Sequence, residues 1–137
     1  MSSVESLCVK YLAALNAGDL EGVLALFATD GTVSSPLYGQ MKAVDFYASL
    51  FEDTGASDTR LLNVFPQSIQ KPAVALHFAY GWTLANGEQV TFECVDVFDL
   101  TEDRERFQHL SIIYDTAPLR AAFYRSSGRP VEHQVGQ

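Results

Sequence analysis

The sequence has few basic residues and no long hydrophobic run. Nine Lys and Arg residues stand against 17 Asp and Glu residues, which gives a formal net charge of −8. An acidic chain repels phosphate backbones, and this argues against a nucleic-acid binder. No apolar run reaches the roughly 18 residues that a membrane-spanning helix needs. Residues 1–5 also lack the basic start of a secretory signal. We therefore expect a protein that binds neither nucleic acid nor membrane.

Cysteine is equally scarce, and metal-binding or phosphate-binding patterns are absent from the sequence. Cys8 and Cys94 lie far apart, in no metal-ligand or redox spacing. They predict reduced, buried thiols in a cytoplasmic protein. His77, His109 and His133 lack the mutual spacing of a metal site. The glycines are scattered and form no phosphate-binding loop. We expect neither a metal nor a cofactor.

What the sequence has is enough apolar material for one domain. Of its 137 residues, 47% are hydrophobic and 12% aromatic. Residues 1–115 form the predicted domain and hold six basic and 16 acidic residues, whereas residues 116–137 hold three arginines and one glutamate. Two alternatives follow for this C-terminal tail. Either it lies on the acidic body or on a partner subunit, or it is solvated.

Apolar residues at helical spacing predict three helices, over residues 4–17, 20–27 and 41–51. Gly18 ends the first helix and Asp19 caps the second, because glycine accepts a left-handed backbone and aspartate bonds to free backbone N–H groups. Residues 32–35 predict a short strand, which Pro36 ends. The first half of the chain is therefore mainly helical.

The second half alternates between apolar and polar residues, as strands do. The pattern predicts strands over residues 60–65, 73–84, 90–100 and 107–115. Asn86-Gly87 forms a hairpin turn, because both residues tolerate positive φ. We expect an α+β fold in which three N-terminal helices pack on one face of a curved antiparallel sheet and enclose a cone-shaped pocket.

One residue breaks the alternation of the strand over residues 90–100. Its apolar face carries Asp96 among Val90, Phe92, Cys94, Phe98 and Leu100. A buried carboxylate must find a partner or stay protonated, and a protonated carboxyl can donate a hydrogen bond to a carbonyl oxygen that gains charge. The alternative is an Asp that caps a loop or pairs with an Arg. Tyr11 and Tyr47 lie on apolar helix faces, where they are either core residues or further hydrogen-bond donors.

Three segments resemble one known family. They are residues 11–33 (YLAALNAGDLEGVLALFATDGTV), residues 45–50 (DFYASL) and residues 94–98 (CVDVF). They resemble the Δ5-3-ketosteroid isomerases of the SnoaL-like group, which has the nuclear-transport-factor-2 (NTF2) fold. The resemblance implies that Tyr11 and Asp96 hold an enolate oxygen and that Tyr47 hydrogen-bonds to Tyr11. It also implies a homodimer.

The sequence departs from this family at the general base. The family has an Asp just before a proline at the end of the first short strand, and here Ser35 precedes Pro36. A serine hydroxyl without an assisting base cannot take a proton from carbon at neutral pH. Other candidate bases are Asp30, Asp45, His109 and Asp115, and spacing does not single one out.

Three functions are open. The first is a steroid delta-isomerase-like or polyketide-cyclase-like enzyme that acts on a small apolar carbonyl compound. The second is a module that binds a phenol or carboxylic acid without turnover, and the third is a structural dimerisation domain. In the first two, the predicted binding residues are Ser35, Phe78, Trp82, Phe92 and Phe98. A dimer would use a sheet face with small residues such as Ala75, Ala79 and Gly81.

Overall fold

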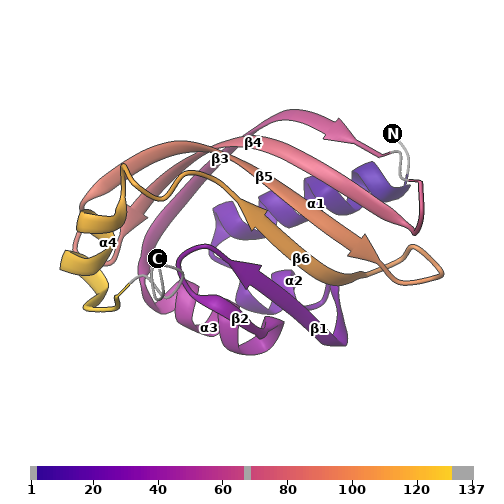
Figure 1. Ribbon diagram of the computed structural model, residues 1–137, viewed down its shortest axis with the longest axis horizontal. Coiled ribbons are helices and arrows are strands. Elements are labelled where there is room, and N and C mark those ends of the chain that lie inside the picture. The colour runs from indigo at the N-terminus through magenta and orange to yellow at the C-terminus, as the bar shows by residue number, and fades with distance from the viewer. Residues whose placement is uncertain (1–2, 67–68, 131–137) are drawn as a thin grey trace.

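The computed structural model describes residues 3–66 and 69–130. Their helices are α1 (Ser3–Ala17), α2 (Leu20–Leu24), α3 (Ala43–Glu52) and α4 (Arg120–Ser127), and their strands are β1 (Phe27–Ser35), β2 (Gly39–Lys42), β3 (Thr54–Phe65), β4 (Ala73–Leu84), β5 (Gln89–Leu100) and β6 (Phe107–Ile113). The strands form one curved sheet that wraps around α1 (Figure 1). The α+β prediction is confirmed.

The sheet is mixed rather than antiparallel, so that detail of the prediction is wrong. Its strand order is β2-β1-β6-β5-β4-β3. All neighbours pair antiparallel except β1 and β6, which are parallel, with Val33 beside Leu110. The cause is the path of the chain. After β2 and α3 the chain crosses to the far edge of the sheet, and it returns through a meander of antiparallel strands from β3 to β6. The last strand therefore arrives beside β1 in the same direction.

Local chemistry sets the boundaries at the start of the chain. Gly18 has φ 65° and ends α1, and the Asp19 carboxylate accepts a hydrogen bond from the Gly22 backbone N–H at 2.9 Å. The second helix is shorter than predicted, and β1 begins earlier, at Phe27. Phe27 pairs in the sheet with Phe107 and is buried, so tertiary packing overrides the helical pattern there.

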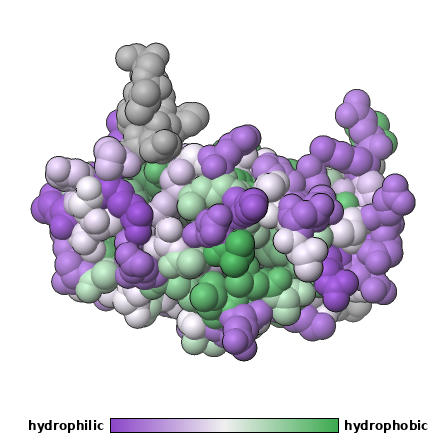
Figure 2. Space-filling view, turned by 90° about the horizontal axis from the view of Figure 1, so that it is seen from below, coloured by the Kyte–Doolittle hydropathy of each residue, from purple (hydrophilic) through white to green (hydrophobic). Residues whose placement is uncertain are grey.

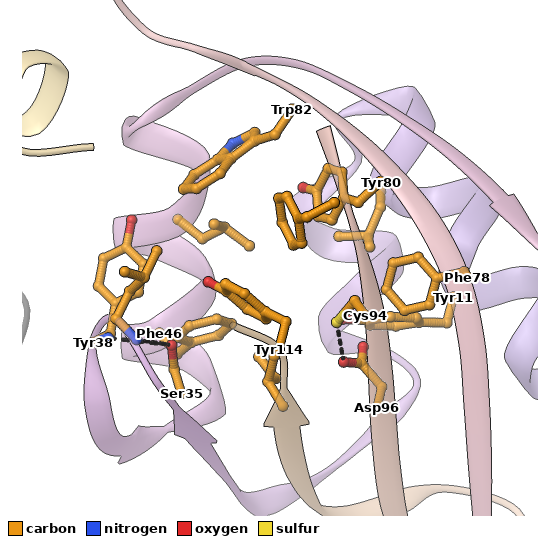
Figure 3. Close-up of a pocket in the computed structure, with 15 residues that line it drawn as sticks. Tyr11, Ser35, Tyr38, Phe46, Phe78, Tyr80, Trp82, Cys94, Asp96 and Tyr114 are labelled. Carbon is orange, nitrogen blue, oxygen red and sulfur yellow. Dashed lines mark hydrogen bonds between the residues drawn. The ribbon is translucent and has the colours of Figure 1, made fainter. Parts of the chain in front are cut away.

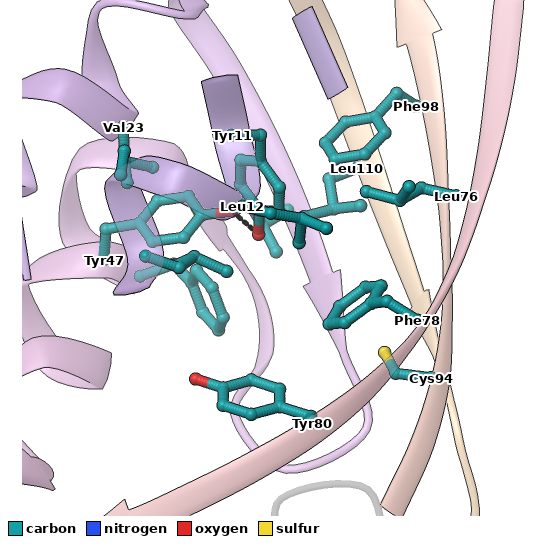
Figure 4. Close-up of a cluster of buried hydrophobic side chains, with 14 of the residues drawn as sticks. Tyr11, Leu12, Val23, Tyr47, Leu76, Phe78, Tyr80, Cys94, Phe98 and Leu110 are labelled. Carbon is teal, nitrogen blue, oxygen red and sulfur yellow. Dashed lines mark hydrogen bonds between the residues drawn. The ribbon is translucent and has the colours of Figure 1, made fainter. Parts of the chain in front are cut away.

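The core lies on the face of the sheet that α1 and α3 cover. Along β4 buried and half-buried residues alternate without exception from Ala73 to Leu84, as the sequence predicts. Aromatic and aliphatic side chains from α1, α3, β4 and β5 fill this layer (Figure 4). Viewed from the side where α2, α3 and β1 lie, most of the surface is hydrophilic, with an apolar patch near the middle (Figure 2). No helix in the described ranges is long and apolar enough to span a bilayer.

Residues 116–130, which the sequence predicts as part of a tail, turn into α4 and pack on the body. Phe123 is fully buried, with its ring 5.3 Å from that of Tyr38 and 6.0 Å from that of Trp82. Arg125 pairs with Glu88 at 2.7 Å. Of the two alternatives for this segment, the structure has the one in which its arginines lie on the acidic body. His133 lies outside the described residues.

Candidate functional site

A pocket opens between the covered face of the sheet and helices α1 and α3 (Figure 3). It encloses about 450 Å³ of empty space, its mouth included, and its walls are mainly apolar. Its lining residues are Tyr11, Leu15, Ser35, Leu37, Tyr38, Phe46, Leu50, Phe78, Tyr80, Trp82, Phe92, Cys94, Asp96, Ile112 and Tyr114. The part of the pocket that the centre of a water-sized sphere can enter is only about 40 Å³, well below the roughly 300–1,000 Å³ of typical small-molecule sites, so a ring compound needs wall side chains to move apart.

Asp96 is the carboxyl group of this pocket. It projects from β5 and is 2% exposed. Burial raises its pKa from 3.8 to about 7, although hydrogen bonds from the Cys94 thiol and the Tyr11 hydroxyl counteract the rise. The Cys94 Sγ lies 3.2 Å from Asp96 Oδ1. Within the described residues no Lys, Arg or His forms an ion pair with Asp96. The carboxyl is thus largely neutral below pH 7.

Tyr11 and Tyr47 form a buried hydroxyl pair beside it. Their oxygens are 2.7 Å apart, and both side chains are at most 2% exposed (Figure 4). Burial raises the pKa of each well above 10, so both stay phenols and keep a proton to donate. Tyr11 lines the pocket, whereas Tyr47 lies behind it on α3. The family resemblance implies this hydrogen bond between the two hydroxyls, and a role of Tyr11 in holding an enolate oxygen stays a prediction.

Ser35 occupies the end of β1 and also lines the pocket. Its Oγ accepts hydrogen bonds from the backbone N–H groups of Leu37 and Tyr38, both at 3.1 Å. An oxygen that already accepts two hydrogen bonds is a poor proton acceptor. Ser35 can therefore donate its own proton to a ligand, but it does not replace the missing base.

The other candidate bases lie away from the pocket. Asp30, Asp45 and Asp115 are exposed, and the pocket lining includes none of them. The His109 ring bonds to the Thr32 hydroxyl at 2.7 Å, on the face of the sheet opposite the buried Val33 and Leu110, and is likewise not in the lining. Among the described residues, Asp96 is thus the lone carboxyl or imidazole that lines the pocket.

The predicted aromatic wall is present with one exception. Phe78, Trp82 and Phe92 line the pocket. Phe98 does not line the pocket. It lies two residues beyond Asp96 on β5, where residues of α1 and β1 pack against the sheet and fill the space. Its ring stacks on Phe107 with centroids 3.9 Å apart and is fully buried.

Sequence reasoning missed three tyrosines of the lining, namely Tyr38, Tyr80 and Tyr114. Tyr80 alternates with Phe78 and Trp82 on β4, so the strand pattern contains the signal for it. Tyr114 comes directly after β6 and continues the alternation of that strand, so the sequence contains a similar signal for it. Tyr38 lies in a turn and has no periodic signal. In the described parts of the chain, no cluster of His, Cys, Asp or Glu could hold a metal ion.

Known proteins share this architecture. The family model described as a SnoaL-like domain matches residues 9–107. The Δ5-3-ketosteroid isomerase from Mycobacterium sp. superposes with a TM-score of 0.66 at 22% identity, covering 85% of this chain and 95% of that one.

Two further structures are similar over comparable lengths. The epoxide hydrolase/cyclase-like enzyme SalBIII, which has a role in pyran ring formation in salinomycin, has a TM-score of 0.69 at 18% identity, covering 82% of this chain and 90% of its own. TerC, co-crystallised with polyporic acid, has a TM-score of 0.71 at 17% identity, covering 93% and 99%. At these identities the structural likeness shows the fold alone. The family match, in contrast, covers most of the chain, which therefore belongs to the SnoaL-like domain family.

Proposed function

We propose that this protein binds a small apolar carbonyl or phenolic compound and stabilises its oxygen with two hydrogen bonds, from Tyr11 and from the protonated Asp96. The observation that carries the proposal is Asp96 itself, a 2%-exposed carboxyl in the wall of an apolar pocket, next to Tyr11. Two neutral donors in a dry site stabilise an enolate or phenolate far better than water does. The name of the mycobacterial relative, a ketosteroid isomerase, fits this chemistry.

The reaction we propose is isomerisation or cyclisation through an enolate-like intermediate. The proton that leaves the substrate carbon passes to a basic group of the substrate itself, because the described lining holds no carboxyl or imidazole besides Asp96. Asp96 stays protonated and donates its hydrogen bond to the substrate oxygen. The second candidate function is binding without turnover. It is favoured by Ser35, which stands where the family has its base and whose oxygen already accepts two backbone hydrogen bonds. The co-crystallisation of TerC with polyporic acid is a precedent for an organic acid as a ligand of this fold.

Binding is tested by titrating a fluorescent phenol, 2-naphthol, into the wild type, Tyr11→Phe and Asp96→Leu, which each lack one of the two donors. Loss of one hydrogen bond to a charged oxygen costs roughly 1.5–3 kcal/mol, so each variant should bind the phenolate form at least tenfold more weakly. Tyr124→Phe, which changes an exposed residue on α4, is the control. If all four proteins bind alike, or none binds, the proposal is wrong.

Turnover is tested with a β,γ-unsaturated ketone and two substitutions of one residue. Ser35→Asp should restore a general base, which typically contributes about 10²–10⁴ in rate. Ser35→Asn has the same shape without the charge and should not. Turnover by Ser35→Asp alone identifies the natural protein as a binder, whereas comparable turnover by the wild type identifies it as an enzyme.

We also propose that the chain acts as a homodimer in the cytoplasm. Cys8 and Cys94 are both buried free thiols, which fits a reducing compartment. The sheet face opposite the helices carries small and aliphatic residues on its central strands. Along β4, every residue on this face is half-buried. A second copy could cover this face.

A further inference from the structure

Nearly all polar groups in the pocket wall are bonded to protein. Outside the Tyr11–Tyr47 pair of the first site, the hydrogen bonds are Tyr38 to Asp53 at 2.6 Å, Tyr80 to Ser57 at 2.8 Å and the Trp82 indole N–H to Thr54 at 2.9 Å. In each of these side chains it is mainly the ring, rather than the polar atom, that faces the pocket. Such groups shape the cavity but have little hydrogen-bonding capacity left for a ligand.

Tyr114 differs from these residues. Its ring is held against Phe92, with centroids 4.5 Å apart. In the described part of the chain no group forms a hydrogen bond with its hydroxyl, which lies at the end of the ring that faces Tyr38 and Phe46, away from Asp96 (Figure 3). Burial raises the pKa of Tyr114 well above 10, so the group stays a phenol and a donor. Tyr114 is only half-buried, and among the described residues no buried side-chain N or O atom lacks a partner, so water reaches this hydroxyl and a ligand oxygen would replace that water.

Ser35 offers a second free donor on the same side. Its oxygen accepts two backbone hydrogen bonds, and no acceptor for its own proton lies among the described residues. Figure 3 shows Ser35 and Tyr114 on one side of the pocket, and Asp96 with Cys94 on the other. The topology explains this separation, because β6 lies between β1 and β5. Two strand spacings of about 4.8 Å place the backbones of Ser35 and Asp96 roughly 10 Å apart.

We infer that Tyr114, with Ser35, forms a second oxygen-binding site opposite Tyr11 and Asp96, and that the ligand is a flat apolar compound with an oxygen at each end. The first oxygen is the phenolic or enolic one that the proposed function assigns to Tyr11 and Asp96, on which this inference rests. The second is a neutral acceptor such as a ring carbonyl or an aldehyde. Donors at both ends also fix which way round the compound binds.

Matched probes test the second site. 4-Hydroxybenzaldehyde and 4-hydroxystyrene have the same shape and differ in one carbonyl oxygen; 6-hydroxy-2-naphthaldehyde and 6-vinyl-2-naphthol form a longer pair. In the wild type the aldehyde of at least one pair should bind about fivefold to tenfold more tightly than its vinyl counterpart. Tyr114→Phe should reduce that ratio several-fold, to the remainder that the greater acidity of the aldehyde's phenol gives at the first site, and leave the affinity for the vinyl compound unchanged. Tyr80→Phe removes a pocket hydroxyl that is bonded to Ser57, and should keep the ratio.

The outcomes separate this inference from the proposed function. If the vinyl compounds bind in a manner that depends on Tyr11 and Asp96, but aldehydes gain nothing or Tyr114→Phe keeps the ratio, the second site is wrong and the first stands. If no probe binds, or if Tyr11→Phe and Asp96→Leu bind the vinyl compounds as the wild type does, both are wrong. Thermal unfolding of each variant shows whether it is folded.

Discussion

At the scale of one residue, Asp96 makes the stability of the protein depend on pH. Its pKa is about 7 in the folded chain and 3.8 as an ordinary aspartate. Between these values the folded state holds a proton that the unfolded state releases. The free energy of unfolding therefore decreases as pH rises from about 4 to about 7, by up to about 4 kcal/mol for a shift of this size. Above pH 7 the carboxylate is ionised in a site built for a neutral group.

Asp96→Asn should remove this penalty, because an amide stays neutral at every pH. We compare the free energy of unfolding of the variant with that of the wild type, measured by urea unfolding at pH 4.5 and pH 8. The difference in favour of the variant should be about 2–4 kcal/mol larger at pH 8 than at pH 4.5. Asp45→Asn replaces an exposed carboxylate and is the control. An equal effect of Asp96→Asn at the two pH values would show that the carboxyl is ionised in the folded state throughout.

Much of the site at this scale is readable from the sequence. The alternation of β5 singles out Asp96, and the helical stripes single out Tyr11 and Tyr47. The sequence could not show that the cavity stops short of Phe98, because that depends on where α1 closes the curved sheet. Nor could it show that the Ser35 oxygen is occupied by the N–H groups of Leu37 and Tyr38, since that bond depends on the turn after Pro36.

At the scale of elements, α4 closes one end of the pocket wall. Its Phe123 lies between Tyr38 and Trp82, which both line the pocket. The Tyr38 hydroxyl donates to Asp53, and Arg129 donates to the same carboxylate oxygen at 2.8 Å. A short amphipathic segment after a proline gives little signal in the sequence. It becomes a helix because the pocket wall provides a surface for Phe123.

Phe123→Ala should therefore affect both stability and the pocket. Removing a fully buried Phe typically costs about 3–5 kcal/mol, and the lost ring also leaves Tyr38 and Trp82 unsupported. We expect a decrease of this size in the free energy of urea unfolding, together with weaker binding of 2-naphthol. Tyr124→Ala, the neighbouring substitution on the same helix, changes a side chain that is 59% exposed and should cost under about 0.5 kcal/mol. Similar losses for both variants would show that α4 contributes through its backbone alone.

At the scale of the whole molecule, the sheet has one face without a helix among the described residues. Residues of β4 and β5 that share this face include Ala75 beside Val97 and His77 beside Val95, and Ile113 of β6 lies beside Val95. The order of the strands along the chain predicts the meander but not the parallel pairing of β1 with β6. That pairing brings together segments that are distant in the sequence. It joins β1 and β2 to the meander and so makes one continuous sheet.

The exposed face leads to a prediction about oligomeric state. Ile113 ends β6 beside Val95 and is 56% exposed, so a partner copy on this face would bury it. The wild type should have about twice the 15.1 kDa mass of one chain in light scattering, more completely at moderate salt, because each chain carries a charge of −8. Ile113→Glu places a charge in the interface and should give the mass of one chain without loss of folding. Val44→Glu changes a residue that is 52% exposed on α3, on the other side of the molecule, and should stay dimeric. A single-chain mass for the wild type, or dissociation by Val44→Glu alone, would place the interface elsewhere or exclude the dimer.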